Sequence, residues 1–168
     1  MQDLSILVLD DEKAIRAEIV EFLNEEGYTL FEADRPSVAF TMLEEVKIDV
    51  LILDLQLPEM DGLSVLKRVK DDYPGMEVIM ITGHGDMDAV IQAMRLGAME
   101  FFTKPFRLLD MKVAIQRSRR FVALSSQLKE ANLGYALLSK ELQESVGHQI
   151  MGVSPAIKRV VDLMQRVA

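Results

Sequence analysis

Four short apolar runs, each followed by a polar residue, constrain the fold of this chain more than any other feature. The runs are LSILVL, DVLIL, EVIMI and EFFT, and the residues that follow them are Asp10-Asp11, Asp54, Thr82 and Lys104. Apolar runs of this length, separated by helix-type segments, are typical of buried strands in a parallel sheet. The polar residues then lie at the C-terminal ends of strands, which is the edge where open α/β sheets bind ligands.

The pattern predicts five strands that alternate with helices. The strands are expected at 4–9, 28–33, 49–54, 77–82 and 99–103, and the helices at 13–26, 36–46, 63–72 and 86–96, with a long helical segment from about residue 108. Gly27 is expected to cap the first helix, and Pro36 to lie in the first turn of the second. Right-handed crossovers predict a flavodoxin-like α/β fold, a doubly wound five-stranded parallel sheet of order 2-1-3-4-5.

Length and composition agree with one domain plus an extension. The chain has 168 residues, 49% of them hydrophobic, and no cysteine. The lack of cysteine excludes disulfides and thiolate metal sites and favours an intracellular protein. The N-terminus MQDLSILVLDDE has no basic segment, and its apolar run is too short for a signal sequence or a membrane span, so a cytoplasmic location is expected.

Charge is distributed unevenly along the chain. The net charge of −8 combines −13 over residues 1–106 with +5 over residues 107–168. An acidic body repels nucleic acid and suits a cation. The basic excess is interpreted as a solvated helix face rather than a polyanion-binding patch, so no direct nucleic-acid binding is expected; it includes Arg107, Lys112, Arg117, Arg119 and Arg120.

The polar residues that converge in this fold suggest a specific chemistry. Three carboxylates, those of Asp10, Asp11 and Asp54, would lie together, and each ionised pair at ~5 Å and a dielectric constant of ~20 costs about 3 kcal/mol. Either a retained proton or a hard divalent cation must compensate, and an all-oxygen site with room for water suits Mg²⁺. Lys104 can bind an oxyanion and Thr82 supplies a hydroxyl, so the set predicts a phosphoryl-transfer site that forms an aspartyl phosphate.

Each residue has a simpler explanation when it is taken alone. Asp11 could be the N-cap of the first helix, Thr82 could belong to an ordinary turn, and Lys104 could lie in an ordinary loop. The four strand ends taken together favour the phosphoryl-transfer site. Without such a site, four separate strands would each have to end by chance at a residue that this chemistry needs.

The sequence resembles the receiver domain of bacterial two-component response regulators over about residues 1–120. The resemblance is carried by Asp10-Asp11, DLQLPEMDG around Asp54, MITGHG with Thr82 and FFTKPF with Lys104. It implies that Asp54 accepts a phosphoryl group from a sensor histidine kinase. It also implies that Mg²⁺ is held by Asp11, Asp54 and the backbone carbonyl of Gln56, with help from Asp10.

The same resemblance implies how phosphorylation would be read out. Thr82 and Lys104 would bind the phosphoryl oxygens, Phe101 would be the switch aromatic, and the Lys104-Pro105 bond would be cis. The family often has tyrosine at the position of Phe101, so a readout that needs the tyrosine hydroxyl is not available here. We expect residues 86–120 to form the regulated homodimer interface.

The C-terminal part suggests a linker and the start of another domain. Apolar residues recur at heptad spacing between 121 and 148, which predicts a parallel dimeric coiled coil, or else a helix docked on its own domain. Residues 149–168 resemble the opening segment of the AAA+ ATPase domain in sigma-54-dependent, NtrC-class activators. We therefore expect a receiver domain at 1–120, a linker at 121–148 and a truncated AAA+ domain at 149–168. No G-x-x-x-x-G-K-[ST] phosphate loop occurs in the sequence.

Two other functions of this fold would require residues that the sequence does not have. A Mg²⁺-dependent phosphatase with an aspartyl-phosphate intermediate would need a second carboxylate two residues after the nucleophile, where this chain has Gln56. A flavin-binding module would need donors in its first loop, where the acidic residues after LSILVL would repel phosphate. A regulatory phospho-acceptor, not an enzyme, is the prediction. Whether phosphorylation disrupts or promotes the dimer stays open.

Overall fold

The computed structural model describes residues 4–83, 87–118, 124, 127–128 and 132–133. In these residues five strands alternate with helices, as predicted, and the boundaries agree to within one or two residues. The elements are β1 (Ser5–Leu9), α1 (Lys13–Glu25), β2 (Thr29–Ala33), α2 (Pro36–Glu45), β3 (Val50–Asp54), α3 (Gly62–Asp72), β4 (Glu77–Thr82), α4 (Met87–Arg95), β5 (Glu100–Thr103) and a helical segment at 108–118.

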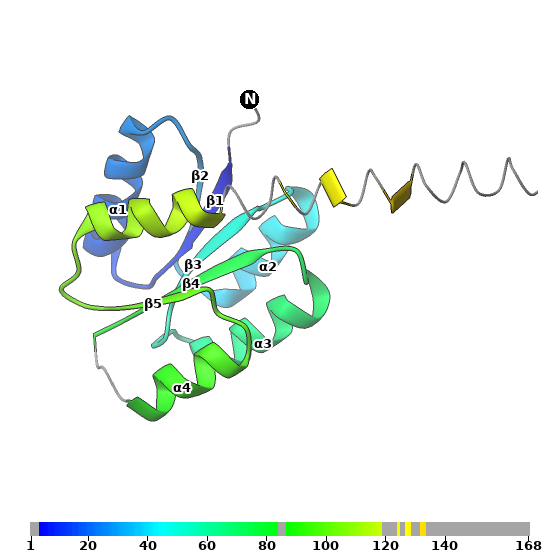
Figure 1. Ribbon diagram of the computed structural model, residues 1–168. Helices are drawn as coiled ribbons and strands as arrows, with labels where there is room; N and C mark the ends of the chain where they lie inside the picture. The colour runs from blue at the N-terminus through cyan, green and yellow to red at the C-terminus, as the bar shows by residue number, and fades with distance from the viewer. Residues whose placement is uncertain (1–3, 84–86, 119–123, 125–126, 129–131, 134–168) are drawn as a thin grey trace, which may run out of the picture. The chain divides into compact units, whose positions relative to one another are not determined.

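The strands form one parallel sheet of order β2-β1-β3-β4-β5 (Figure 1). Leu7 of β1 lies opposite Phe31 of β2 on one side and opposite Leu51 of β3 on the other. The predicted fold class and strand order are confirmed. β2 lies on one side of β1, and β3, β4 and β5 follow on the other side. In open α/β sheets this change of direction, here between β1 and β3, leaves a crevice at the C-terminal ends of the two strands.

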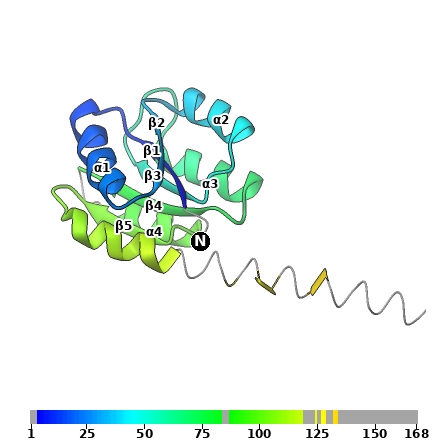
Figure 2. The same cartoon turned by 90° about the horizontal axis from the view of Figure 1, so that it is seen from above.

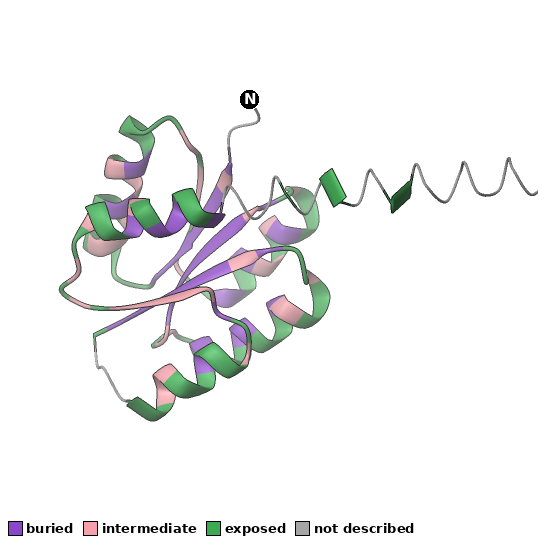
Figure 3. Ribbon diagram, viewed as in Figure 1, coloured by how far each residue is buried: buried purple, intermediate pink, exposed green. Residues whose placement is uncertain are grey.

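Helices cover both faces of the sheet (Figures 1 and 2). Because neighbouring strand residues point to opposite faces, Leu7, Leu9 and Leu51 pack with α2, α3 and α4, whereas Ile6 and Val8 pack with α1 and the segment 108–118. β3 is buried from end to end, and β1 and β4 are buried except at their first residue, as the colours in Figure 3 show. The core is therefore two apolar layers that share the sheet, and it holds the strand ends rigidly.

The predicted helix ends at Gly27 and Pro36 are confirmed. Gly27 has φ of +81° and its N–H donates to the carbonyl of Asn24 at 3.1 Å. A residue with a side chain would be strained in this left-handed conformation, so the glycine lets the chain turn directly into β2. Pro36 lies in the first turn of α2, where no backbone N–H is needed.

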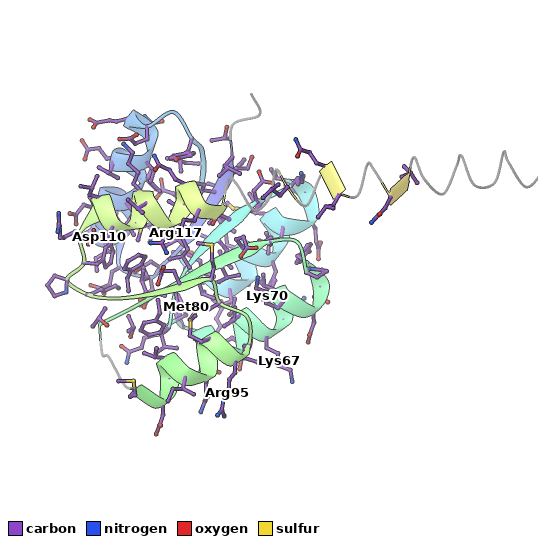
Figure 4. All side chains as sticks on the ribbon, in the orientation of Figure 1. Lys67, Lys70, Met80, Arg95, Asp110 and Arg117 are labelled. Atoms are coloured by element: carbon purple, nitrogen blue, oxygen red, sulfur yellow. The ribbon has the colours of Figure 1, made fainter. Side chains whose placement is uncertain are left out.

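The basic residues of the segment 108–118 are paired with carboxylates. Arg117, labelled in Figure 4, lies 3.1 Å from Glu100 of β5, and Lys112 lies 2.6 Å from Glu26. These pairs favour a solvated, ion-paired helix face over a polyanion-binding patch. Arg119 and Arg120 lie outside the described residues.

The chain divides into two units, Met1–Val122 and Ala123–Ala168. The predicted linker at 121–148 and the predicted AAA+ segment at 149–168 lie outside the described residues, apart from 124, 127–128 and 132–133, which are helical. Both stay predictions. None of the helices in the described part of the chain has the length and apolar character needed to cross a bilayer.

Candidate functional site

Four strands bring their polar C-terminal residues to one edge of the sheet. Asp10 follows β1, Asp54 ends β3, Thr82 ends β4 and Lys104 follows β5. Asp10, Asp54 and Thr82 are buried. Carboxylates are almost never fully buried unless they are paired with another group. The predicted convergence is thus seen directly in the positions of these side chains.

The ammonium group of Lys104 lies among three carboxylates. Its Nζ atom is 3.0 Å from Asp10 Oδ2, 3.0 Å from Glu12 Oε1 and 3.1 Å from Asp54 Oδ2. A lysine ammonium has three N–H donors, so this arrangement uses all of them. One cation therefore balances three potential negative charges.

Asp10 is held firmly from several sides. Its Oδ1 atom accepts a hydrogen bond from the Glu12 N–H at 2.7 Å, and its own N–H donates to the carbonyl of Ala33 at 3.3 Å. The guanidinium of Arg16 donates to the Asp10 carbonyl at 2.7 Å and pairs with Glu32 at 3.2 Å. Sequence inspection did not single out Arg16, because its role depends on the fold of α1 back onto β1.

The environment of Asp54 disfavours its charged form. Burial raises the pKa of the Asp54 carboxyl, and the nearby charge of Asp10 raises it further, while Lys104 acts in the opposite direction. The net shift of the Asp54 pKa is upward because burial and the charge of Asp10 together outweigh the effect of Lys104. An additional positive charge at this site would restore the ionised carboxylate.

Lys104 responds in the opposite way. Burial by itself lowers the pKa of the Lys104 ammonium, but the hydrogen bonds to Asp10 and Glu12 and the charge of Asp54 outweigh burial and raise it above its usual value. Lys104 therefore remains charged throughout the physiological pH range.

Glu12 belongs to the acidic cluster, and Asp11 does not. Oxygen atoms of Asp10, Glu12 and Asp54 lie within 4.8 Å of one another, and Asp11 is not among them. Both Asp11 and Glu12 are exposed, so the difference lies in the direction of the side chain. The alternative that Asp11 caps α1 is wrong, because Glu12 is the N-cap residue and makes no side-chain capping bond. Sequence reasoning missed Glu12; the signal was the third consecutive carboxylate after β1.

The loop between β3 and α3 is closed tightly behind Asp54. The Gly62 N–H donates to the Leu55 carbonyl at 2.8 Å, and Asp61 caps α3 by accepting from the Ser64 N–H at 3.0 Å. The Gln56 N–H lies 3.5 Å from Asp54 Oδ1. The loop thus returns the chain to the Asp54 backbone within a few residues.

Glu59 fastens the tip of this loop to α2. Its φ of +70° is left-handed, which is uncommon for a residue with a side chain. Its carboxylate accepts from the Ser37 N–H and from the Ser37 hydroxyl, both at 3.2 Å. A carboxylate at the first turn of a helix also interacts favourably with the helix dipole.

Gly62 is required by close approach of the backbone. A Cβ atom at this position would lie 2.7 Å from Leu55 Cα and 2.9 Å from the Leu55 carbonyl oxygen. We expect Gly62→Ala to destabilise the fold by about 1–3 kcal/mol, because these backbone atoms cannot move aside without distorting the loop. Urea unfolding checks this. Gly75→Ala, where a Cβ would meet no atom within 4 Å, is the control, and equal losses for both variants would contradict the explanation.

Thr82 ends β4, the strand beside β3 and Asp54, and Phe101 lies one strand further out, in β5. Thr82 is fully buried, and its carbonyl accepts from the Lys104 N–H at 2.7 Å. Phe101 lies opposite Met80 of β4, which Figure 4 labels, and is partly buried against the core on the α2–α4 side. The Lys104-Pro105 peptide bond is cis.

An open cavity lies beside the acidic cluster. It has a volume of about 490 Å³ and is lined by Glu12, Ile15, Glu18, Gly83, Lys104, Pro105 and Phe106. Lys104 is therefore approached from this cavity on one side and from the buried carboxylates on the other.

Comparison with known proteins identifies related sequences. Residues 6–116 match the family described as response regulator receiver domain. The DNA-binding transcriptional regulator NtrC of Proteus hauseri is 30% identical over all 168 residues, which cover 34% of that protein. Sporulation initiation phosphotransferase F of Bacillus subtilis is 33% identical over 117 residues, 70% of this chain and 94% of that protein.

Solved structures show the same similarity. A receiver domain protein from Clostridium thermocellum has a TM-score of 0.69 and 35% identity, and the match covers 72% of this chain and 98% of that one. The beryllofluoride-activated NtrC4 receiver domain dimer has a TM-score of 0.67 and 33% identity, covering 70% of this chain and 98% of that one. This chain spans about a third of the length of its NtrC relative.

Proposed function

This chain belongs to the response regulator receiver domain family, and from that premise we propose that Asp54 is the residue that accepts the phosphoryl group. The chain is a receiver domain of a two-component response regulator, similar to those of NtrC. The observation that carries the proposal is the convergence of Asp54, Asp10 and Lys104 at one sheet edge, with Lys104 Nζ 3.1 Å from Asp54 Oδ2.

The proposed reaction is a phosphoryl transfer to a carboxylate. An Asp54 carboxylate oxygen attacks the phosphorus of a sensor kinase's phosphohistidine, a P–O bond forms, and the P–N bond breaks with the imidazole as leaving group. Lys104 binds an oxygen of the transferred group, and the Thr82 hydroxyl donates to another. The buried position of Asp54 keeps bulk water away from the resulting acyl phosphate.

We place Mg²⁺ at the acidic cluster. The hard carboxylate oxygens of Asp10 and Asp54, within 4.8 Å of one another, suit this ion. The Gln56 backbone carbonyl and the Asp11 carboxylate, which is exposed in this structure and would have to turn toward the ion, would complete the set. When bound, Mg²⁺ neutralises charge on the carboxylates and on the transferred phosphoryl group. Such an ion would also offset the burial and the Asp10 charge that raise the pKa of Asp54.

We propose that the face formed by α4, β5 and the segment 108–118 carries the response. Phosphorylation adds about −1.5 to −2 units of charge, which would draw Thr82 toward the phosphoryl group and allow Phe101 to move into the space behind it. On α4, Met87, Ile91 and Met94 are exposed by 70%, 42% and 47%. Apolar side chains at this spacing on a helix favour a protein partner over water, and a second copy of this chain is the partner we propose.

The proposed downstream element is a sigma-54-dependent AAA+ ATPase domain, which would follow a receiver at 1–120 and a helical linker at 121–148 and begin at 149–168. The support is the alignment with NtrC along the whole chain. Leu124 and Leu128, two residues of the predicted heptad seam, are helical and exposed by 58% and 64%, as expected for a seam whose partner is another chain. We propose a cytoplasmic transcription regulator within a phosphorelay.

The phosphatase alternative is not favoured. Gln56 stands two residues after Asp54, so a general acid at that position is missing, and the family match is to a regulatory domain.

Acetyl phosphate and beryllium fluoride test the proposal. With Mg²⁺, acetyl phosphate is expected to increase the mass of the protein by one phosphoryl group, and beryllium fluoride is expected to change its self-association. Without Mg²⁺, neither effect is expected. Intact mass spectrometry and light scattering measure the two outcomes. An unchanged mass contradicts the phospho-acceptor role, and an equal oligomeric state with and without the mimic contradicts the regulated interface.

A further inference from the structure

We propose that Glu12 is a positioning residue that sets the rate of phosphoryl transfer by competing for Lys104. Its carboxylate occupies one of the three donor positions of the Lys104 ammonium, at 3.0 Å, and must release it before that ammonium can bind the transferred group. The inference rests on the proposed phospho-acceptor role of Asp54.

The Lys104 ammonium already uses all of its hydrogen-bond donors. Its three N–H groups match three carboxylate partners, Asp10, Glu12 and Asp54, at 3.0, 3.0 and 3.1 Å. A lysine ammonium has no fourth donor. An incoming phosphoryl oxygen can therefore bind Lys104 only in place of one of these three.

Glu12 is the carboxylate that can release Lys104 most easily. The side chain of Asp10 is fully buried, and its other oxygen accepts from the Glu12 N–H at 2.7 Å, so it cannot turn toward water. Asp54 is buried and is itself the acceptor of the group. Glu12 is 58% exposed, and among the described residues its carboxylate pairs with Lys104 alone. An exposed carboxylate regains water when it releases its partner, whereas a buried one does not.

Glu12 and Lys104 both line the open cavity beside the acidic cluster, so the Glu12–Lys104 pair is accessible from solvent. The backbone of Glu12 is fixed by the bond to Asp10, and only its side chain needs to rotate for release. The Glu12 side chain thus controls whether the third N–H of Lys104 is available to a phosphoryl oxygen.

Glu12→Gln tests the inference because it preserves shape and an acceptor oxygen but removes the charge. At saturating Mg²⁺, we expect its phosphorylation by acetyl phosphate, followed by intact mass, to be about three- to fivefold faster than that of the wild type, the ratio set by the strength of a partly exposed ion pair. The gain should shrink as salt increases, since salt screens such pairs. Glu21→Gln, the same substitution at an exposed position of α1, is expected to keep the wild-type rate.

A second donor separates competition for Lys104 from simple repulsion. Phosphoramidate carries less negative charge than acetyl phosphate, and release of Lys104 predicts a similar gain with both. Equal rates for Glu12→Gln and wild type, a slower variant, or a gain with acetyl phosphate alone would each overturn the inference while leaving Asp54 as acceptor. If the wild type takes up no phosphoryl group from either donor, the proposed function fails, and the inference fails with it.

Discussion

Asp54→Asn is expected to abolish covalent phosphorylation of this receiver domain. An amide has no nucleophilic carboxylate oxygen, so acetyl phosphate with Mg²⁺ should leave the mass of the variant unchanged while the wild type gains one phosphoryl group. The neighbours Asp10 and Lys104 are not expected to substitute, since both carboxylate oxygens of Asp10 accept hydrogen bonds, from the Glu12 N–H and from Lys104, and Lys104 is a protonated ammonium. Intact mass spectrometry after equal incubation measures the difference.

The loss should not come from unfolding. Since burial and Asp10 raise the pKa of Asp54, its ionised form opposes folding at neutral pH, and a neutral amide of the same size should leave the free energy of unfolding equal or higher. Asp71→Asn, the same substitution at an exposed carboxylate of α3, is the control and should be phosphorylated normally. Phosphorylation of the Asp54→Asn variant at the wild-type rate would show that another residue is the acceptor.

Lys104→Met is expected to cause the largest loss of stability among substitutions at the site. It leaves the buried carboxylates of Asp10 and Asp54 without their cation, and removing one partner of a buried ion pair costs about 3–5 kcal/mol. Urea unfolding at neutral pH without Mg²⁺ measures the loss. Lys67→Met, on the outer side of α3 in Figure 4, is the control and should change stability little.

The pH dependence of the Lys104→Met variant follows from the direction of the shifts. In the wild type the folded-state pKa of Lys104 is raised, so its stabilising effect is complete below the unfolded-state pKa and is lost only in alkali. In the variant the pKa of Asp54, already raised, loses the opposing effect of Lys104, and a protonated Asp54 favours folding. The variant should therefore recover stability as the pH falls from 7 toward about 5. A variant as stable as the wild type at both pH values would contradict the central role of Lys104.

Much of the fold could be predicted because the local pattern and the global topology agree. The runs that end before Asp10 and at Asp54 are buried on both faces, as expected for central strands of a parallel sheet. Gly27 has the left-handed conformation that glycine favours, and Pro36 lies in a first helical turn, where no backbone N–H is needed. Asp11 shows where this reasoning stops. One residue of difference along the chain reverses the direction of a side chain, and spacing alone does not say which of three consecutive carboxylates turns inward.

The sequence by itself determined which strands exist, in which order they pair, and that Asp54, Thr82 and Lys104 meet at one edge, because strand periodicity and right-handed crossovers leave few other arrangements. Only the tertiary structure decided how charge is shared there. The path of the chain between β1 and α1 brings Glu12 to the Lys104 ammonium and leaves Asp11 in solvent. The hydrogen bonds from Lys104 to Asp10 and Glu12 join residues 94 and 92 positions apart in sequence. The distances between them are set by the packing of β1 against β3 and of β5 against β4, which local sequence patterns do not specify.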